Sequence, residues 1–475
     1  HDPDPNVGIC IQTMGWRETT GTNMNPWKLT RNMNCISTTT NGGDFLEAHY
    51  FRSIARGKPI RDGEMYVDAS ARGIADKYWL QMARGFSASY VFKWCKRGWD
   101  WKPNNAQGAQ RIAARSPWLI LNPYRYSAEA LTGFQRARRE MHTVGDLFFP
   151  RNRGVDVEVA VLISYPTQRL ARANGGVEHN AVEDYAAALE YGHYPIDVIL
   201  EEQMTDARHE EYRVIVAAGV DAVYPQTYDH LERFVENGGI LILGLEAMQH
   251  DEYGRPNQSA SWLEGLQLGK RLDPHRGTLD LDWQPDHKTP DAMEGRAHRQ
   301  IEIDEPWQSI GRVNNQPVIF HRTFGQGTVY FVNAQMPDPA LASMLGGILK
   351  RHEIERECRI TSTADGRLPL GIEVHKARRD GLVAWYLRHD HPSPHLVRFA
   401  DERLRGQAVA LVDPLKGIRH EIRDGSAILL LEPNHRKVLV AGSASQIAAR
   451  FGNLDLVSQA ESMSEGRKAI EAHMQ

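Results

Sequence analysis

The sequence has little cysteine, no long apolar run and no excess of basic residues. Its four cysteines, Cys10, Cys35, Cys95 and Cys358, lie far apart with no C-x2-C pair. We therefore expect free buried thiols rather than a zinc site or a disulfide framework. No run of about 18 apolar residues occurs, which argues against a membrane-spanning helix. The formal net charge of −4 argues against a nucleic-acid surface, because such a surface needs a basic face.

Short motifs for metal or nucleotide binding are also scarce. The stretch GQG at 325–327 is not continued as G-x-G-x-x-G and predicts a hairpin turn. The stretch HDHPSPH at 389–395 has the residue types of a metal site, but no motif such as H-E-x-x-H supplies a further ligand. A solvated turn between strands is the favoured interpretation. We expect neither a metal nor an organic cofactor.

The 475 residues exceed one ordinary core and predict two to four domains. Residues 1–150 alternate apolar strands and helices, which indicates a parallel sheet with helical crossovers. Residues 155–355 form a second α/β pattern with near-continuous Val/Ile runs, as in strands buried on both faces. A flavodoxin-like doubly wound sheet is the prediction for this segment. It contains no cysteine to act as an amidotransferase-type nucleophile, so we expect a structural role.

The remaining segments differ in pattern. Residues 251–316 are polar and rich in Gly, Pro and Asp, so we expect an irregular insertion within the second α/β unit. Residues 368–447 show six short strands at close spacing with turn residues between them, which predicts a small β-sandwich. The tail, 448–475, is charged and is expected to be helical or disordered.

Glu64 stands where the third strand ends, in the stretch GKPIRDGEMYVD. In a parallel α/β barrel, a carboxylate at that end of a strand projects into the active-site mouth; the alternative is an exposed loop glutamate. Tryptophans favour the first interpretation. Trp94 ends the next strand, Trp16 and Trp27 follow the first strand, and seven of the eleven tryptophans lie within residues 1–118. Flat aromatic faces with a polar edge suit a sugar ring, and beside a carboxylate they make a glycosidase subsite.

Three stretches carry a resemblance to a known family. ARGKPIRDGEM (55–65), ARGFSASYVFKW (83–94) and NVGICIQTMGWRETTGTNMNPWKLTRNMNCIS (6–37), with the order of the two downstream domains, resemble the second half of a glycoside hydrolase family 42 enzyme of clan A. The resemblance implies an α/β fold: half of a (β/α)8 barrel, then a flavodoxin-like trimerisation domain, then a small β-sandwich. It implies Glu64 as the nucleophile, Trp94 as a sugar contact, and Trp16, Trp27 and Tyr66 as further substrate-binding residues.

Two departures from the family shape the expected function. The general acid/base, a glutamate after an asparagine at the end of strand four, has no counterpart in the chain, and the strand-six end STTTNGGD lacks the usual Asp-x-Tyr-Pro. Glu18, Asp44 and Asp62 lack the acid's motif. We expect the chain to be the C-terminal part of a longer polypeptide, inactive without the upstream half-barrel.

The expected activity is that of a retaining, β-galactosidase-like hydrolase of terminal β-linked sugars. The expected partners are a carbohydrate substrate and two further copies of the chain in a homotrimer, and a cytoplasmic location is favoured over secretion. Two alternatives remain open: another clan A glycosidase of mannosidase or agarase type, and a non-catalytic carbohydrate-binding or assembly protein with an incomplete barrel.

Overall fold

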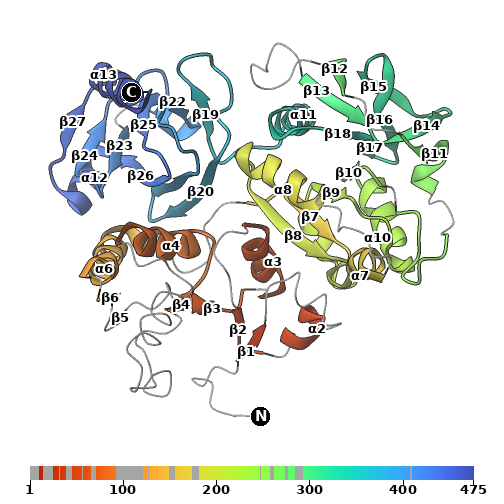
Figure 1. Ribbon diagram of the computed structural model, residues 1–475, viewed down its shortest axis with the longest axis horizontal. Coiled ribbons are helices and arrows are strands. Elements are labelled where there is room, and N and C mark those ends of the chain that lie inside the picture. Colours follow the sequence, from red (N-terminus) through yellow and green to blue (C-terminus); the bar gives the residue numbers. More distant parts are fainter. Residues whose placement is uncertain are drawn as a thin grey trace.

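The computed structural model describes the chain as three packed units (Figure 1). We call residues 10–148 the N-terminal unit, 156–351 the middle unit and 359–474 the C-terminal unit. The residues that the structure describes are 10–13, 25–31, 33–38, 45–55, 57–65, 71–91, 121–122, 125–126, 128–148, 156–173, 181–246, 248–256, 261–272, 276–283, 293–406 and 409–474.

The N-terminal unit contains a sheet of four parallel strands in sequence order, with helices between them. The strands are β1 (Cys10–Thr13), β2 (Cys35–Thr38), β3 (Ile60–Met65) and β4 (Ala88–Val91). The helices are α2 (Pro26–Thr30), α3 (Phe45–Ala55), α4 (Ala71–Ala83) and α6 (Ala128–Phe148), and β5 (Leu121–Asn122) pairs with β6 (Arg125–Tyr126). Strands that run in the same direction need such crossovers, as the alternating pattern predicts.

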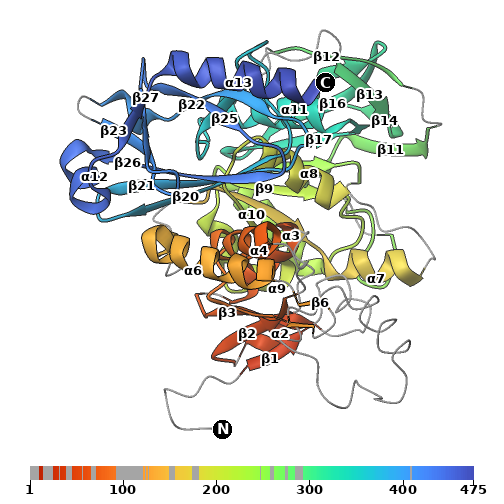
Figure 2. The same cartoon turned by 60° about the vertical axis from the view of Figure 1, so that its left-hand side comes forward.

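Helices α3 and α4 lie on one face of this sheet (Figure 2). Phe51 and Ile54 of α3 share a hydrophobic cluster with Ile36 of β2 and Ile60 of β3, and all four are almost fully buried. The apolar stripe of α3 therefore fixes which face of β2 and β3 the helices cover.

The parallel part of the middle unit is buried on both faces. Its strands run in the order β8-β7-β9-β10-β17. They are β7 (Val159–Ile163), β8 (Ile196–Leu200), β9 (Val214–Ala218), β10 (Ile240–Gly244) and β17 (Gly327–Val332). Val159 and Val161 pack in the hydrophobic cluster that contains helices α8 (Ala181–Tyr191) and α11 (Asp338–Arg351). Ala160 and Leu162 pack in the cluster that contains helix α10 (Pro225–Glu236). Because side chains alternate between faces, one Val/Ile-rich strand serves both helix layers. The helices are α7 (Tyr165–Ala173), α8 (Ala181–Tyr191), α9 (Glu201–Met204), α10 (Pro225–Glu236) and α11 (Asp338–Arg351).

The irregular structure expected for residues 251–316 is wrong. Five strands lie there: β11 (Leu266–Arg271), β12 (Gly277–Leu281), β13 (Met293–Ala297), β14 (Arg299–Ile303) and β15 (Gln308–Val313). β12, β13 and β15, together with β16 (Gln316–Phe324) and β18 (Ala334–Gln335), extend the parallel strands into one ten-stranded sheet. In β12, Leu279 is buried between two exposed neighbours, Thr278 and Asp280. Such short strands, half of whose residues are polar, resemble loop in composition. The hairpin turn expected at 325–327 is confirmed: it joins β16 to β17, and the two strands pair antiparallel.

The C-terminal unit consists of two sheets packed face to face. One is β19 (Arg359–Ser362), β22 (His395–Ala400) and β25 (Ser426–Leu431). The other is β20 (Ile372–Arg379), β21 (Leu382–His389), β26 (His435–Ser443), β23 (Val409–Asp413), β24 (Ile418–His420) and β27 (Asp455–Val457). Phe399 of the first sheet packs edge-on against Trp385 of the second, with ring centroids 5.2 Å apart. The tail forms helices α12 (Ala444–Phe451) and α13 (Gln459–Met474).

Two cysteines have described side chains. Cys358 is a free, buried thiol, and burial raises its pKa well above the usual value. Cys35, in β2, is disulfide-bonded, so the expectation of four free thiols is wrong there. In the part of the chain that the structure describes, no helix is both long and apolar enough to cross a membrane.

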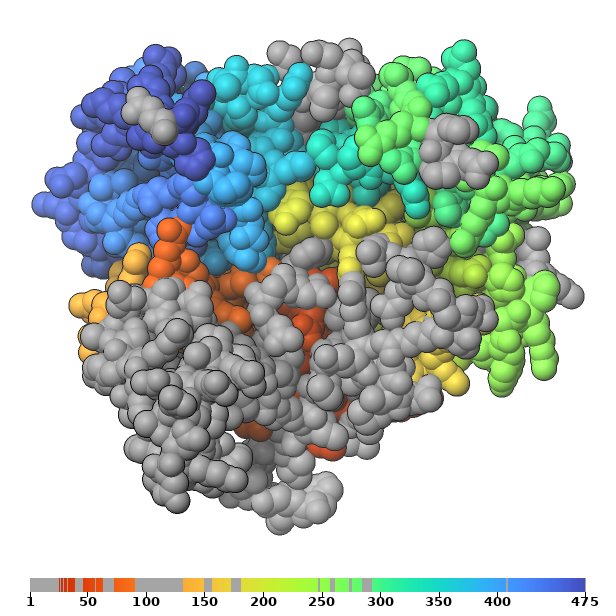
Figure 3. Space-filling view, viewed as in Figure 1, coloured from red at the N-terminus to blue at the C-terminus, as the bar shows by residue number. Residues whose placement is uncertain are grey.

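A buried ionic cluster joins the three units. The Arg84 guanidinium, directly after α4, donates to both carboxylate oxygens of Glu373 in β20, at 2.7 and 2.9 Å. His375 Nε2 lies 2.6 Å from Glu373 Oε1, and His49 of α3 lies 3.3 Å from the carboxylate of Glu190 in α8. Burial alone would raise the pKa of Glu373, but the Arg84 charge and the His375 hydrogen bond hold it well below its usual value. Figure 3 shows the orange surface of the N-terminal unit in contact with the blue surface of the C-terminal unit.

We expect Arg84→Ala to destabilise the protein by about 3–5 kcal/mol, because the substitution leaves the Glu373 carboxylate buried without its partner. Urea unfolding at pH 7 measures the loss. The matched control is Arg276→Ala, which breaks an exposed pair with Glu294, whose side chains are 68% and 58% exposed, and should cost about 0–1 kcal/mol. Equal effects of the two substitutions would contradict the importance of the buried pair.

Candidate active site

Glu64 lies one residue before the end of β3, at the edge of the sheet where the parallel strands β1 to β4 end. The carboxyl ends of parallel strands are where α/β folds place their sites. The backbone position predicted from the sequence is therefore the one observed. Of the side chain of Glu64 the structure gives no description.

A register shift interrupts β3 just before Glu64. Arg61 pairs with Ala88 and Asp62 with Ser89, but the next pair is Met65 with Val91. Three steps along β3 thus match two along β4, so one residue is extra. Bulges of this kind are frequent at barrel rims and beside active sites, where they change the direction of a side chain.

Asp62, two residues before Glu64, is completely buried and has structural partners. The Gln81 amide of α4 donates to the Asp62 carboxylate, and the Ser89 hydroxyl of β4 donates to Gln81. A buried carboxylate needs such donors to offset its lost hydration. Because Gln81 belongs to a helix above the sheet, Asp62 lies on the helix-covered face.

The opposite face of the same strands is polar. Ser37 of β2 is fully buried, and it pairs in register with the half-buried Arg61 of β3. Ile36 and Ile60, their neighbours in the chain, face the helices, so alternation places positions 37 and 61 on the other face. Ligand pockets use a small number of placed polar groups of this kind.

Of the four aromatic residues predicted to bind substrate, the structure describes Trp27. Trp16, Tyr66 and Trp94 fall outside the described residues. Trp27 lies in α2, is 4% exposed and packs in the hydrophobic cluster of Ile36 and Leu46. In this arrangement the Trp27 ring contributes to the core beneath the strand ends.

A second polar centre lies at the carboxyl ends of β7, β8 and β9, beside the point between β7 and β9 where the strand order of the middle sheet changes direction. Glu201 follows β8 and accepts hydrogen bonds from the Thr227 hydroxyl (2.6 Å) and the Tyr224 backbone N–H (2.8 Å). Burial raises the pKa of Glu201 to about 8, although these hydrogen bonds oppose the shift. Sequence reasoning missed this residue; its signal is the polar pair Glu201–Glu202 directly after the apolar run IDVIL.

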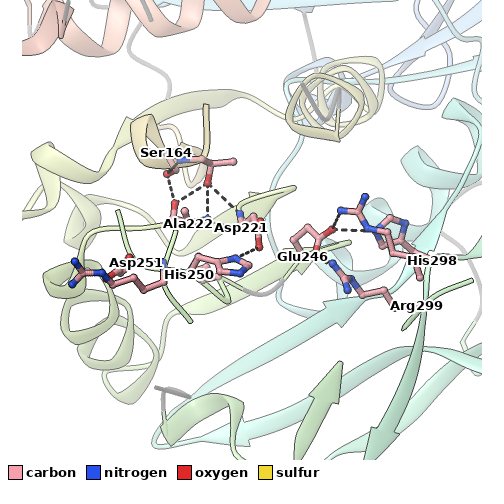
Figure 4. Close-up of polar contacts among 12 residues, drawn as sticks. Ser164, Asp221, Ala222, Glu246, His250, Asp251, His298 and Arg299 are labelled. Carbon is pink, nitrogen blue, oxygen red and sulfur yellow. Dashed lines mark hydrogen bonds and ion pairs between the residues drawn. The ribbon is translucent and has the colours of Figure 1, made fainter. Parts of the chain in front are cut away.

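Ser164, after β7, holds the neighbouring loop (Figure 4). Its hydroxyl donates to the Ala222 carbonyl (2.5 Å), to which the Thr167 hydroxyl also donates (2.7 Å). The Thr167 oxygen accepts in turn from the backbone N–H groups of Asp221 and Ala222. Because the Ser164 proton is already given to a backbone carbonyl, this serine is a loop anchor rather than an activated nucleophile.

A third buried carboxylate, Glu246, follows β10 and is surrounded by cations (Figure 4). Arg299 donates to one of its oxygens at 2.7 Å, and Arg271 lies 2.8 Å and His298 3.2 Å from the other. Burial alone would raise the pKa of Glu246, but His298, Arg299 and Arg271 lower it to about 2. β11 and β14 form a separate two-stranded sheet. Through Arg271 and Arg299, Glu246 attaches this small sheet to the end of β10.

The whole fold is similar to that of solved glycoside hydrolases. A catalytic mutant of a family 42 β-galactosidase from G. stearothermophilus aligns with a TM-score of 0.70 at 14% identity, covering 92% of this chain and 64% of that one. The β-galactosidase from Bacillus circulans sp. alkalophilus aligns with a TM-score of 0.68 at 15% identity and the same coverages, 92% and 64%. A family 42 exo-carrageenase from Bacteroides ovatus aligns with a TM-score of 0.56 at 15% identity, covering 88% of this chain and 49% of that one.

By sequence alone, no protein-family model and no curated protein matches the chain. The resemblance to family 42 is nevertheless confirmed at the level of the fold: a mixed α/β chain with one large sheet and a β-rich C-terminal unit, as in those enzymes. The chain spans 64% of the length of the β-galactosidases that it matches.

We expect the raised pKa of Glu201 to make stability depend on pH. A carboxyl whose pKa is about 8 in the folded protein and near its ordinary value in the unfolded chain stabilises the fold fully below about pH 4.5, and this contribution is lost as the pH rises through 8. The Glu201→Gln variant should not lose stability in this way. At pH 8.5 its free energy of unfolding should exceed that of the wild type by more than about 1 kcal/mol, since one pKa unit corresponds to about 1.4 kcal/mol.

Urea unfolding at pH 5, 6.5 and 8.5 checks this expectation. Glu236→Gln, at an exposed position at the end of α10, is the matched control and should keep the wild-type pH profile. Parallel profiles for wild type and Glu201→Gln would contradict the raised pKa.

Proposed function

We propose that the protein is a retaining glycoside hydrolase of β-galactosidase type, and that its N-terminal unit is the second half of a (β/α)8 barrel. The observation that carries the proposal is the coincidence of two facts. The fold is similar to that of family 42 β-galactosidases, and a glutamate stands near the carboxyl end of a parallel strand in the N-terminal unit.

In the proposed reaction the Glu64 carboxylate attacks the anomeric carbon and displaces the leaving-group oxygen, which gives a covalent glycosyl-enzyme. A second carboxylic acid protonates that oxygen and then activates water to release the sugar. The two carboxyl groups of a retaining enzyme lie about 5–5.5 Å apart, because the nucleophile must touch the ring carbon directly.

The register shift in β3 supports the role of Glu64. Position 62 lies on the helix-covered face, and strict alternation would put position 64 there too. One extra residue between Asp62 and Met65 exchanges the faces beyond it, as any one-residue slip does. Position 64 then belongs to the polar face, with Ser37 and Arg61, which is the side of the substrate mouth in a barrel.

We infer that the acid/base carboxylate is not among the residues of this chain. Asp62 is occupied by Gln81 on the other face of the strand, and no Asn-Glu pair follows an apolar strand in residues 1–150. In the proposal, Trp16, Trp94 and Tyr66 line the sugar site as aromatic platforms, and Trp27 supports them from the core.

We further propose that the middle unit is a flavodoxin-like trimerisation domain. Numbered along the chain, its parallel strands β8-β7-β9-β10-β17 follow the order 2-1-3-4-5, which is the flavodoxin order. Static light scattering should give three times the chain mass for the protein in solution, whereas a monomer would contradict the trimerisation role.

The Glu64→Gln variant of the full-length protein tests the nucleophile. The amide keeps the size of the side chain but cannot form the glycosyl ester, so we expect hydrolysis of a nitrophenyl β-D-galactoside to fall by several orders of magnitude while galactose binding persists. Glu294→Gln, at a side chain 58% exposed in the added strands, is the matched control and should retain wild-type activity.

Three outcomes distinguish the hypotheses. Retained activity in Glu64→Gln would overturn the nucleophile assignment. Cleavage of an aryl mannoside but not of the galactoside would favour the other clan A activities. Sugar binding without hydrolysis of any aryl glycoside by the wild type would favour the non-catalytic alternative.

A further inference from the structure

Three histidines converge at one end of the C-terminal unit. His389 ends β21, His395 begins β22, and His391 lies in the turn between them. One ring nitrogen of each lies within 4.8 Å of those of the other two. Contrary to the solvated turn expected from the sequence, His389 is 1% exposed, while His391 and His395 are half-buried.

The closest contact is a hydrogen bond between two rings. His395 Nδ1–H donates to His389 Nε2 at 2.9 Å and lies 3.2 Å from the Ser393 carbonyl, and the planes of the two rings are 85° apart. A metal ion bound here takes the place of this proton. A tetrahedral Zn²⁺ ion with Zn–N bonds of about 2.0–2.1 Å holds its ligand nitrogens about 3.3 Å apart. Small ring rotations therefore suffice to admit an ion between them.

A hydrogen bond to the surrounding backbone orients His389 as in metal sites. His389 Nδ1–H donates to the Glu432 carbonyl at 2.8 Å, which leaves Nε2 with its lone pair toward the cluster. Ligating histidines commonly donate their other N–H to a backbone carbonyl in this way. The Ser393 backbone N–H contacts His391 Nδ1 at 3.1 Å and holds that ring over the turn.

The cluster is open to solvent on one side. Half-exposed His391 and His395 leave a path from solvent, and a fourth position remains for water.

We propose that His389, His391 and His395 bind one divalent transition-metal ion, of which zinc is the best match to a set of three imidazoles. The site is separate from the proposed active site. β21 belongs to the six-stranded sheet and β22 to the three-stranded sheet, so the ion ties the two sheets together where they are joined by a turn. Its role is structural: it closes one end of the C-terminal unit.

Calorimetric titration of the chelator-treated full chain with Zn²⁺ tests the proposal. We expect one ion per chain, an increase of the melting temperature with zinc, and the visible absorption of tetrahedral Co²⁺ when cobalt replaces it. His391→Ala and His395→Ala should each weaken zinc binding by about 100-fold or more, since even partners of ligating residues contribute 10–100-fold.

The matched control is His142→Ala, which removes an exposed histidine of α6 and should leave the titration unchanged. His391 is half-exposed and its removal leaves the core intact, so far-UV circular dichroism of His391→Ala should equal that of the wild type. The proposal is overturned if the wild type binds no zinc at one equivalent, or if His391→Ala and His395→Ala bind it as tightly as His142→Ala.

Discussion

The architecture depends on the buried pair between Arg84 and Glu373. An arginine and a carboxylate removed from water recover their hydration only through close, paired hydrogen bonds. The two bonds of 2.7 and 2.9 Å supply these, and they form only when the end of α4 meets β20 in one arrangement. His375, lying between Glu373 and Glu190, extends the constraint to α8. A hydrophobic contact would allow sliding, but this cluster permits one placement of the three units.

The C-terminal end of α4 links the Arg84–Glu373 pair to β3, the strand that carries Glu64. Gln81 lies three residues before Arg84, on the last turn of α4, and its amide binds Asp62 of β3. Asp62 is the last residue in register before the shift that precedes Glu64. A polar path thus runs from the C-terminal unit through α4 to the strand end. We infer that the downstream units help to set the position of Glu64, the proposed nucleophile.

Much of this fold could be predicted from the sequence because its main strands are runs of buried apolar residues. The Val/Ile runs of β7 to β10 and the short apolar strands β20, β21 and β26, separated by turn residues, show this. Residues 251–316 could not be predicted this way: in β12 only Leu279 is buried, and the other strands are rich in polar and charged residues. The stretch with the three histidines was visible in the sequence, but the burial of His389 and the approach of the rings were not, because they depend on how the two sheets pack.

Some features of the candidate site could also be predicted from the sequence, and others could not. The position of Glu64 near a strand end follows from the local pattern, since Lys58-Pro59 ends the preceding helix and a short strand begins at Ile60. The bulge beside it, the burial of Trp27 and the capture of Asp62 by Gln81 depend on contacts between distant segments. The raised pKa of Glu201 results from its burial in the folded protein. The spacing of residues in the sequence does not reveal that burial.

Trapping of the glycosyl-enzyme tests the account most directly. A dinitrophenyl 2-deoxy-2-fluoro-β-D-galactoside carries a leaving group that departs without protonation, so labelling reports on the nucleophile independently of the acid/base residue. The account predicts one fluorosugar per chain, with peptide mapping placing the ester on Glu64. A label on another carboxylate, in protein that hydrolyses aryl galactosides, would contradict it.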